Sequence, residues 1–111
     1  MPLVTQLTAP ASPNVEFQVK DDPAPGPSGP YTANVTVSWD PNYLTRTAHT
    51  AGETYFDNAQ GIVVWTLQHI PREGTVTFTV DFTRATAGTT FVVGTAVECV
   101  GGERDTDYTR I

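Results

Sequence analysis

Few residues in this chain could act as nucleophiles. A serine hydrolase needs a serine held beside a base that activates it. Ser12 precedes a proline, Ser28 lies in a proline-rich stretch and Ser38 falls within a predicted strand. None of them stands in a Gly-x-Ser-x-Gly elbow. Cys99 is the single cysteine, and no motif pairs it with either histidine. We therefore expect no catalytic residues and no enzyme.

Acidic residues near the C-terminus could bind a cation. Glu103, Asp105 and Asp107 offer carboxylate oxygens of the kind that Ca²⁺ prefers, but no twelve-residue calcium loop surrounds them. Zinc is disfavoured, since His49 and His69 lie twenty residues apart and only one cysteine is present. We expect solvated acidic turns here, with no metal and no cofactor.

Aromatic side chains could bind a ligand or a protein. Trp39 and Trp65 could stack on a sugar ring, but both lie on the apolar side of their predicted strands, so we expect them in the core. The better candidates for contact with a partner lie near turns. They are Tyr43, Tyr55, Phe56 and Tyr108.

The composition indicates an all-β domain and excludes several classes of partner. The 111 residues include nineteen Thr and thirteen Val but only seven Leu and Ile together, and β-branched side chains favour strands. The formal net charge of −6 disfavours nucleic-acid binding. No apolar run approaches the roughly 20 residues of a membrane span, so we expect no membrane insertion.

Alternating apolar and polar residues predict the strands. Val76, Phe78, Val80 and Phe82 alternate with polar residues without error, and we expect them to face inward against Trp65 and Leu67. The segment 90–100 is apolar on both parities, which predicts a bulge near Gly94. Residues 21–30, with four prolines and two glycines, form a loop. Seven to nine short strands at about ten-residue spacing predict a Greek-key β-sandwich.

Four blocks carry a resemblance to a known family. They are Ala33-Asn34-Val35-Thr36-Val37-Ser38-Trp39-Asp40-Pro41, Gly61-Ile62-Val63-Val64-Trp65-Thr66-Leu67, Gly74-Thr75-Val76-Thr77-Phe78-Thr79-Val80 and Ala87-Gly88-Thr89-Thr90-Phe91-Val92-Val93-Gly94-Thr95-Ala96-Val97. In order and spacing, 15–111 resembles the repeat called domain of unknown function eleven. That is an immunoglobulin-like module of bacterial and archaeal surface proteins. Gly94 stands where the family has Asn. The resemblance implies an immunoglobulin-like sandwich with a structural or adhesive role and no cofactor.

The N-terminal segment precedes the resemblance. Residues 1–13 are expected to form an arm or the first strand, and 14–111 a single domain. Leu3, Val4 and Leu7 are apolar, so an arm would gain from docking on another chain. We expect partner contacts at these three residues and at Tyr43 and Tyr55.

Three functions remain open. The first is a structural protein on the outside of a virus particle, such as a capsid decoration protein, since the chain begins with its own Met and shows no secretory signal. Its partner would be a protein shell, such as a major capsid protein, or neighbouring copies of itself. The second is an excised repeat of a bacterial or archaeal adhesin or stalk protein on the extracellular cell surface. The third is a carbohydrate-binding module.

Overall fold

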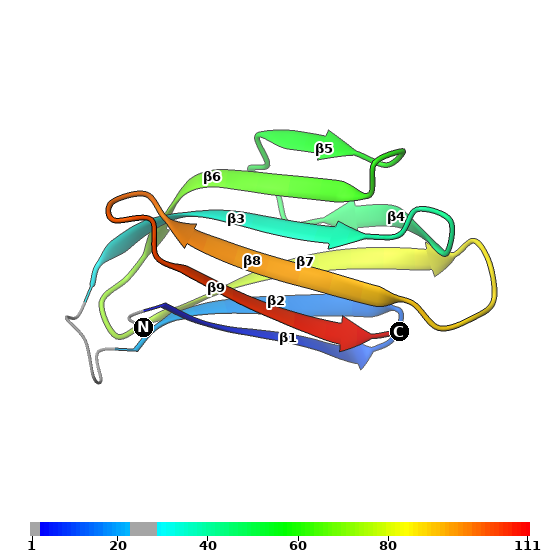
Figure 1. The fold of residues 1–111 in the computed structure, drawn as a ribbon, viewed down its shortest axis with the longest axis horizontal. Helices are drawn as coiled ribbons and strands as arrows, with labels where there is room; N and C mark the ends of the chain where they lie inside the picture. Colours follow the sequence, from blue (N-terminus) through cyan, green and yellow to red (C-terminus); the bar gives the residue numbers. More distant parts are fainter. Residues whose placement is uncertain (1–2, 23–28) are drawn as a thin grey trace.

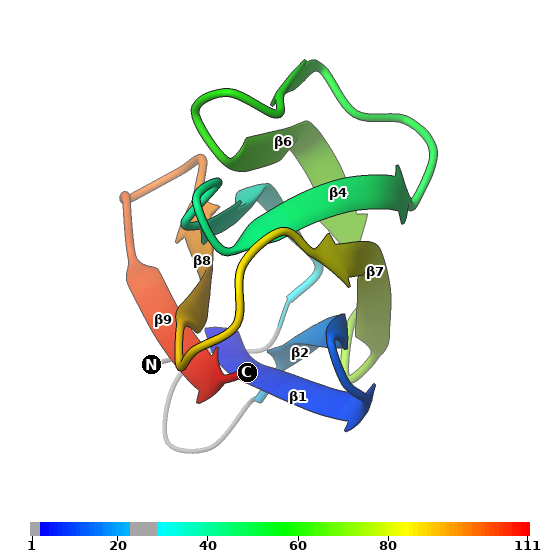
Figure 2. The same cartoon turned by 90° about the vertical axis from the view of Figure 1, so that its right-hand side faces the viewer.

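Two antiparallel sheets pack face to face and contain nine strands among the residues described by the computed structural model, 3–22 and 29–111. Four strands follow the order β1-β2-β7-β4, and five follow β5-β6-β3-β8-β9. Figure 1 shows both layers, and Figure 2 shows them end-on. The chain crosses repeatedly between the sheets, which confirms the predicted all-β Greek-key sandwich. No helix in the described ranges is long and apolar enough to cross a bilayer.

The strand bounds follow the predicted alternation closely. The four-stranded sheet contains β1 (Leu3–Ala11), β2 (Asn14–Asp21), β7 (Thr75–Arg84) and β4 (Leu44–His49). The five-stranded sheet contains β5 (Tyr55–Asp57), β6 (Ile62–Ile70), β3 (Tyr31–Trp39), β8 (Phe91–Glu98) and β9 (Arg104–Arg110). The predicted loop over 21–30 lies partly outside the described residues, and Asp21 still belongs to β2.

Aromatic side chains from both sheets build the core. The Trp65 ring lies 4.8 Å from that of Phe78, and the Trp39 ring meets Phe82 edge-on at 5.0 Å. Both tryptophans are buried, as predicted, so neither can offer its face to a sugar. Phe78, Val80 and Phe82 of β7 are also buried, which confirms the predicted register of this strand.

The inward position predicted for Leu67 is wrong. A bulge interrupts the pairing of β6 with β3 opposite Ala33 and Val35, and a bulge reverses the side to which the following side chains point. Leu67 takes a φ of 54°, its N–H donates to Asn34 Oδ1 at 3.0 Å, and its side chain is 72% exposed. Val76, which was also expected inside, is half-buried at the margin of the core.

The bulge predicted near Gly94 is also wrong. β8 pairs with β3 and β9 without a shift of register. Gly94 faces inward, where a Cβ atom would lie 2.5 Å from the ring of Phe17. The strand is apolar on both parities because its outer face is apolar as well.

The N-terminal residues belong to the sandwich. Of the alternatives for 1–13, the structure has the first strand, because β1 pairs with β2 along most of its length. Leu3 and Leu7 are buried in the core, so the prediction that they contact a partner is wrong. Val4 points to the outer face of its sheet and is 38% exposed. Met1 and Pro2 lie outside the described residues.

The contact between Gly94 and Phe17 gives a test of the packing. Gly94→Ala is expected to lower the free energy of unfolding by about 1–3 kcal/mol, because the added methyl group overpacks the core. Urea titration measures the loss. Thr95→Ser, on the outer face of the same strand, keeps the hydroxyl that lies 3.3 Å from that of Thr106 and is the control, with an expected change below about 0.5 kcal/mol. In the Gly94→Ala background, Phe17→Leu should recover part of the lost stability. An equal loss of stability in the variants at Gly94 and at Thr95 would contradict the contact with Phe17.

Candidate functional site

Carboxylates of β9 close one edge of the sandwich. The backbone N–H and the hydroxyl of Thr5 both donate to Asp105 Oδ2 at 2.8 Å, and the N–H of Leu7 donates to Asp107 Oδ2 at 2.7 Å. These N–H groups face away from β2 on the edge strand β1. Figures 1 and 2 both show β1 beside β9, although the two strands belong to different sheets. The edge N–H groups of Thr5 and Leu7 are therefore satisfied within the domain.

The sequence offered two interpretations of the acidic segment, calcium ligands or solvated turns, and the structure shows a third role for its aspartates. Asp105 and Asp107 are half-buried acceptors for β1 rather than solvated turn residues, while Glu103 is exposed before β9. Their Oδ2 atoms are engaged by N–H groups and a hydroxyl of β1. Over 3–22 and 29–111 there is no group of three or more His, Cys, Asp and Glu side chains that could hold a metal ion.

His49 and Cys99 have separate neighbours. The His49 Nε2 atom lies 3.1 Å from Glu53 Oε1, and its ring packs against Phe56 and Trp65. The hydrogen bond from His49 holds the pKa of Glu53 below its usual value. The Cys99 thiol lies exposed, 3.6 Å from Asn34 Oδ1. The structure therefore does not bring these two residues together as a nucleophile and a base.

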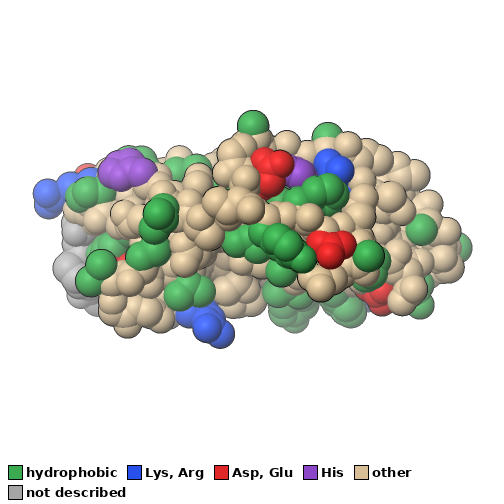
Figure 3. All heavy atoms as spheres, turned by 90° about the horizontal axis from the view of Figure 1, so that it is seen from above, with side chains coloured by type: hydrophobic (Ala, Val, Ile, Leu, Met, Phe, Trp, Pro, Cys, Tyr) green, Lys and Arg blue, Asp and Glu red, His purple; other side chains and the backbone are tan. Residues whose placement is uncertain are grey.

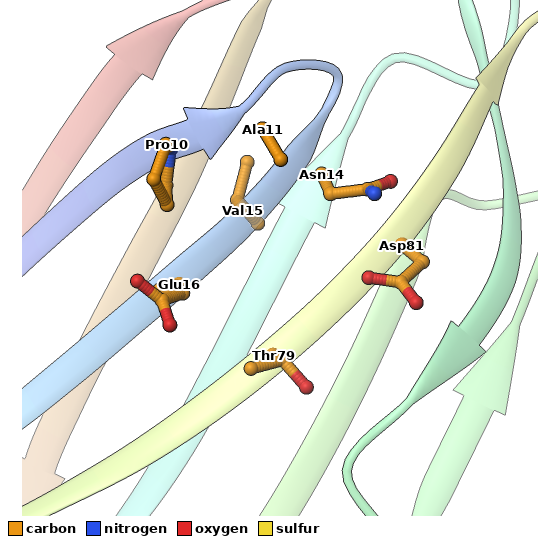
Figure 4. A pocket seen from close by; sticks show the side chains of 7 residues that line it. All are labelled: Pro10, Ala11, Asn14, Val15, Glu16, Thr79 and Asp81. Atoms are coloured by element: carbon orange, nitrogen blue, oxygen red, sulfur yellow. The ribbon is translucent and has the colours of Figure 1, made fainter.

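Two shallow hollows lie on the outer face of the four-stranded sheet. Figure 4 shows the first, of about 190 Å³, with Glu16 and Asp81 on neighbouring strands. Its Asn14 already accepts the N–H of Phe82 through Oδ1 at 3.0 Å. The second, of about 380 Å³, contains Lys20 as its charged residue among threonine, glutamine and valine side chains. In the first hollow the hydroxyl of Thr79 is hydrogen-bonded to the hydroxyl of Thr50 at 3.2 Å.

The outer faces of the two sheets differ in character. The four-stranded sheet is covered mainly by uncharged and charged polar side chains, which we call the polar face: Gln6, Thr8, Glu16, Gln18, Lys20, Thr75, Thr77 and Thr79. The five-stranded sheet carries aliphatic and aromatic side chains, which we call the apolar face: Tyr55, Ile62, Val64, Leu67, Phe91, Val93, Val97 and Tyr108. Exposed apolar side chains on both sides of the central strand of an antiparallel sheet indicate a binding surface.

The most exposed members of the apolar face are large. Leu67 lies at one end, while Phe91 and Tyr108 are 50% and 65% exposed and stack edge-on with ring centres 5.8 Å apart. Figure 3 looks onto the edge formed by β5 and β6 and shows hydrophobic side chains at the surface among few charged ones. The left-handed backbone of Leu67 is unfavourable for a bulky residue. Such strain is concentrated at functional sites.

Two of the predicted tyrosines have different surroundings. Tyr55 lies on the apolar face, and its hydroxyl donates to Gln60 Oε1 at 3.0 Å. Partial desolvation, followed by the nearby Asp57 carboxylate, raises the pKa of this exposed hydroxyl. Tyr43 instead packs against the core, and its ring lies next to Gly88.

The sequence interpretation named only Tyr55 and Tyr108 of the apolar face and missed its most exposed aliphatic member, Leu67, and the aromatic Phe91. The signal for Phe91 was present, because the apolar residues of its strand fall on both parities. Leu67 carried no such signal, since its position depends on the bulge opposite β3.

The comparisons with known proteins bear on the fold. No family model and no curated protein matches the sequence. The solved structures similar to this chain include a cohesin module from the family 33 glycoside hydrolase of Clostridium perfringens ATCC13124. The TM-score is 0.59 at 8% sequence identity, and the match covers 98% of this chain and 94% of the module. The likeness supports the sandwich architecture, and the resemblance to the conserved surface repeat stays a prediction.

The edge closure can be tested with one acidic residue of β9. Asp107→Ala is expected to lower the free energy of unfolding by about 1–3 kcal/mol, because the N–H of Leu7 loses its charged acceptor. Glu103→Ala removes the same charge outside the edge and is the matched control, with an expected loss below about 0.5 kcal/mol. Urea titration of both variants measures the difference. Equal losses would show that the carboxylate of Asp107 does not stabilise the edge.

The strain at Leu67 gives a second test. Leu67→Gly is expected to raise the free energy of unfolding by about 0.5 kcal/mol, because relief of the left-handed backbone exceeds the added chain entropy of glycine. Thermal unfolding and urea titration would measure the change. A loss above about 1 kcal/mol would show that the Leu67 side chain stabilises its own domain rather than serving a partner.

Proposed function

We propose that this chain is a non-enzymatic structural module that binds another protein through its apolar face. The observation that carries the proposal is the contrast between the two outer faces. Both sheets bury their inner faces in the same core, so the apolar outer residues are not needed for the sandwich itself. An aliphatic and aromatic face left in water lowers solubility unless a partner covers it.

The composition of the apolar face fits a protein partner. Protein interfaces are enriched in Tyr, Phe and Arg and depleted of charge at their centre. Phe91 and Tyr108 supply the aromatic pair, and Arg104 and Arg110 flank it on the same side of β9. Rigid aromatic side chains beside arginine are typical of the residues that contribute most to binding.

The surroundings of the candidate nucleophiles support a non-enzymatic role. Among the described residues, Ser38 lies within β3, and Cys99 follows β8 with its thiol 3.6 Å from Asn34 Oδ1. His49 is engaged with Glu53. Ser28 lies outside the described residues. These surroundings fit a binding role better than a catalytic one.

The biological setting is also part of the proposal. One setting is the outside of a virus particle, with a capsid shell as partner. The likeness to a cohesin module, which is itself one module of a larger protein, supports the alternative of a repeat on the extracellular cell surface. In both settings the partner is a protein surface, so the apolar face would be the binding surface in either case. A carbohydrate-binding role loses support because Trp39 and Trp65 are buried.

Site-specific photo-crosslinking in the native source tests this proposal. A benzophenone side chain placed at Tyr108 is expected to form an adduct with a polypeptide, because that position lies on the apolar face. The same group at Thr77, on the polar face, is the matched control and should give no adduct. Mass spectrometry identifies the attached chain, so a shell protein and a cell-surface protein are distinguished.

Two results would contradict the proposal. Adducts from Thr77 and none from Tyr108 would place the binding surface on the polar face. No adduct from either position would show that neither outer face contacts a protein.

A further inference from the structure

We propose that the partner of the apolar face is a second copy of this chain, packed face to face about a two-fold axis that runs along β3. The inference rests on the proposed function and names its partner. A two-fold interface uses the same patch on both copies, so that patch must be complementary to itself. Three properties of the apolar face meet this condition.

The first property is the arrangement of the apolar side chains in two stripes. One stripe lies on β5 and β6 and contains Tyr55, Ile62, Val64 and Leu67. The other lies on β8 and β9 and contains Phe91, Val93, Val97 and Tyr108. Between them β3 presents the smaller polar side chains of Asn34, Thr36 and Ser38. A two-fold axis along β3 places each stripe against the opposite stripe of the second copy, so apolar surface meets apolar surface.

The second property is the distribution of charge. Arg104 and Arg110 lie on the β9 side of the apolar face, where they pair with Val97 and Phe91. Asp57 lies on the β5 side, where it pairs with Ile62. An axis along β3 brings the β5 side of one copy over the β9 side of the other, and the strand register then sets Asp57 near Arg110. An axis across the strands would instead place arginine against arginine, so charge selects the first arrangement.

The third property is the available area. β3, β6, β8 and β9 are seven to nine residues long, and β5 is three residues long. At about 3.3 Å per residue and about 4.8 Å between strands, the face covers roughly 600 Å² per copy. Two copies would bury about 1,200 Å² in total, which lies at the lower end of specific interfaces and suits a reversible dimer.

The net charge does not oppose this contact. The chain carries a formal charge of −6, yet the apolar face presents Arg104 and Arg110 against Asp57. The acidic side chains of Asp105 and Asp107 are turned toward β1. The repulsion between two copies is therefore lowest where these faces meet.

Sedimentation equilibrium of the purified chain, from about 5 to about 500 μM, tests the dimer over the range expected for an interface of this size. Tyr108→Glu and Arg110→Glu should each raise the dissociation constant at least about tenfold. Tyr108→Glu removes an apolar contact, and Arg110→Glu reverses a charge. If one of these variants fails to fold, the other still tests the interface. The matched controls are Val4→Glu on the polar face and Arg72→Glu in the turn after β6. Both should leave the dissociation constant unchanged. Thermal unfolding confirms that each variant is folded.

Three results overturn a dimer through the apolar face. A wild-type chain that stays monomeric at the highest concentration excludes the dimer, while a heterologous adduct from Tyr108 in the crosslinking experiment would leave the proposed function standing. Monomer together with no adduct would reject both proposals. A dimer that Val4→Glu disrupts and Tyr108→Glu does not would show that the copies meet through the polar face.

Discussion

The hydrogen bonds from β1 to the carboxylates of Asp105 and Asp107 hold the first and last strands of the domain together across the gap between the sheets. They satisfy edge N–H groups that would otherwise be a template for another strand. They also determine which way β9 faces. Because its acidic side chains turn toward β1, the alternate residues Arg104, Tyr108 and Arg110 lie on the outside.

The character of the two outer faces follows from this geometry. The closed edge disfavours partner binding by strand addition at β1, and the polar face is ordinary solvated sheet surface. The apolar face remains as the surface best suited to bind a protein. Leu67 extends it through a strained backbone that is held by the side chain of Asn34. Neither the strain nor the exposed aromatic pair contributes to the core, which is why we assign both to binding.

Alternation within single strands was enough to predict the sandwich, the inward tryptophans and the register of β7. It failed where a residue's position depends on a distant strand. The outward turn of Leu67 depends on the bulge opposite β3, and the contact of Gly94 depends on a phenylalanine in β2. The roles of Asp105 and Asp107 depend on β1 lying beside β9, a contact between strands about 100 residues apart. Pattern along the chain carries no information about such pairings until the topology is known.

Hydroxyl-radical footprinting tests most directly whether the apolar face is covered by protein. The reactivity of Phe91, Tyr108 and Leu67 would be compared between the dilute purified chain and the chain in its native assembly, with Val4 and Val100 as exposed reference residues elsewhere on the surface. Our account predicts that the first three lose reactivity in the assembly while Val4 and Val100 keep theirs. Full reactivity of Phe91 and Tyr108 in the assembly, with protection of Val4, would contradict it.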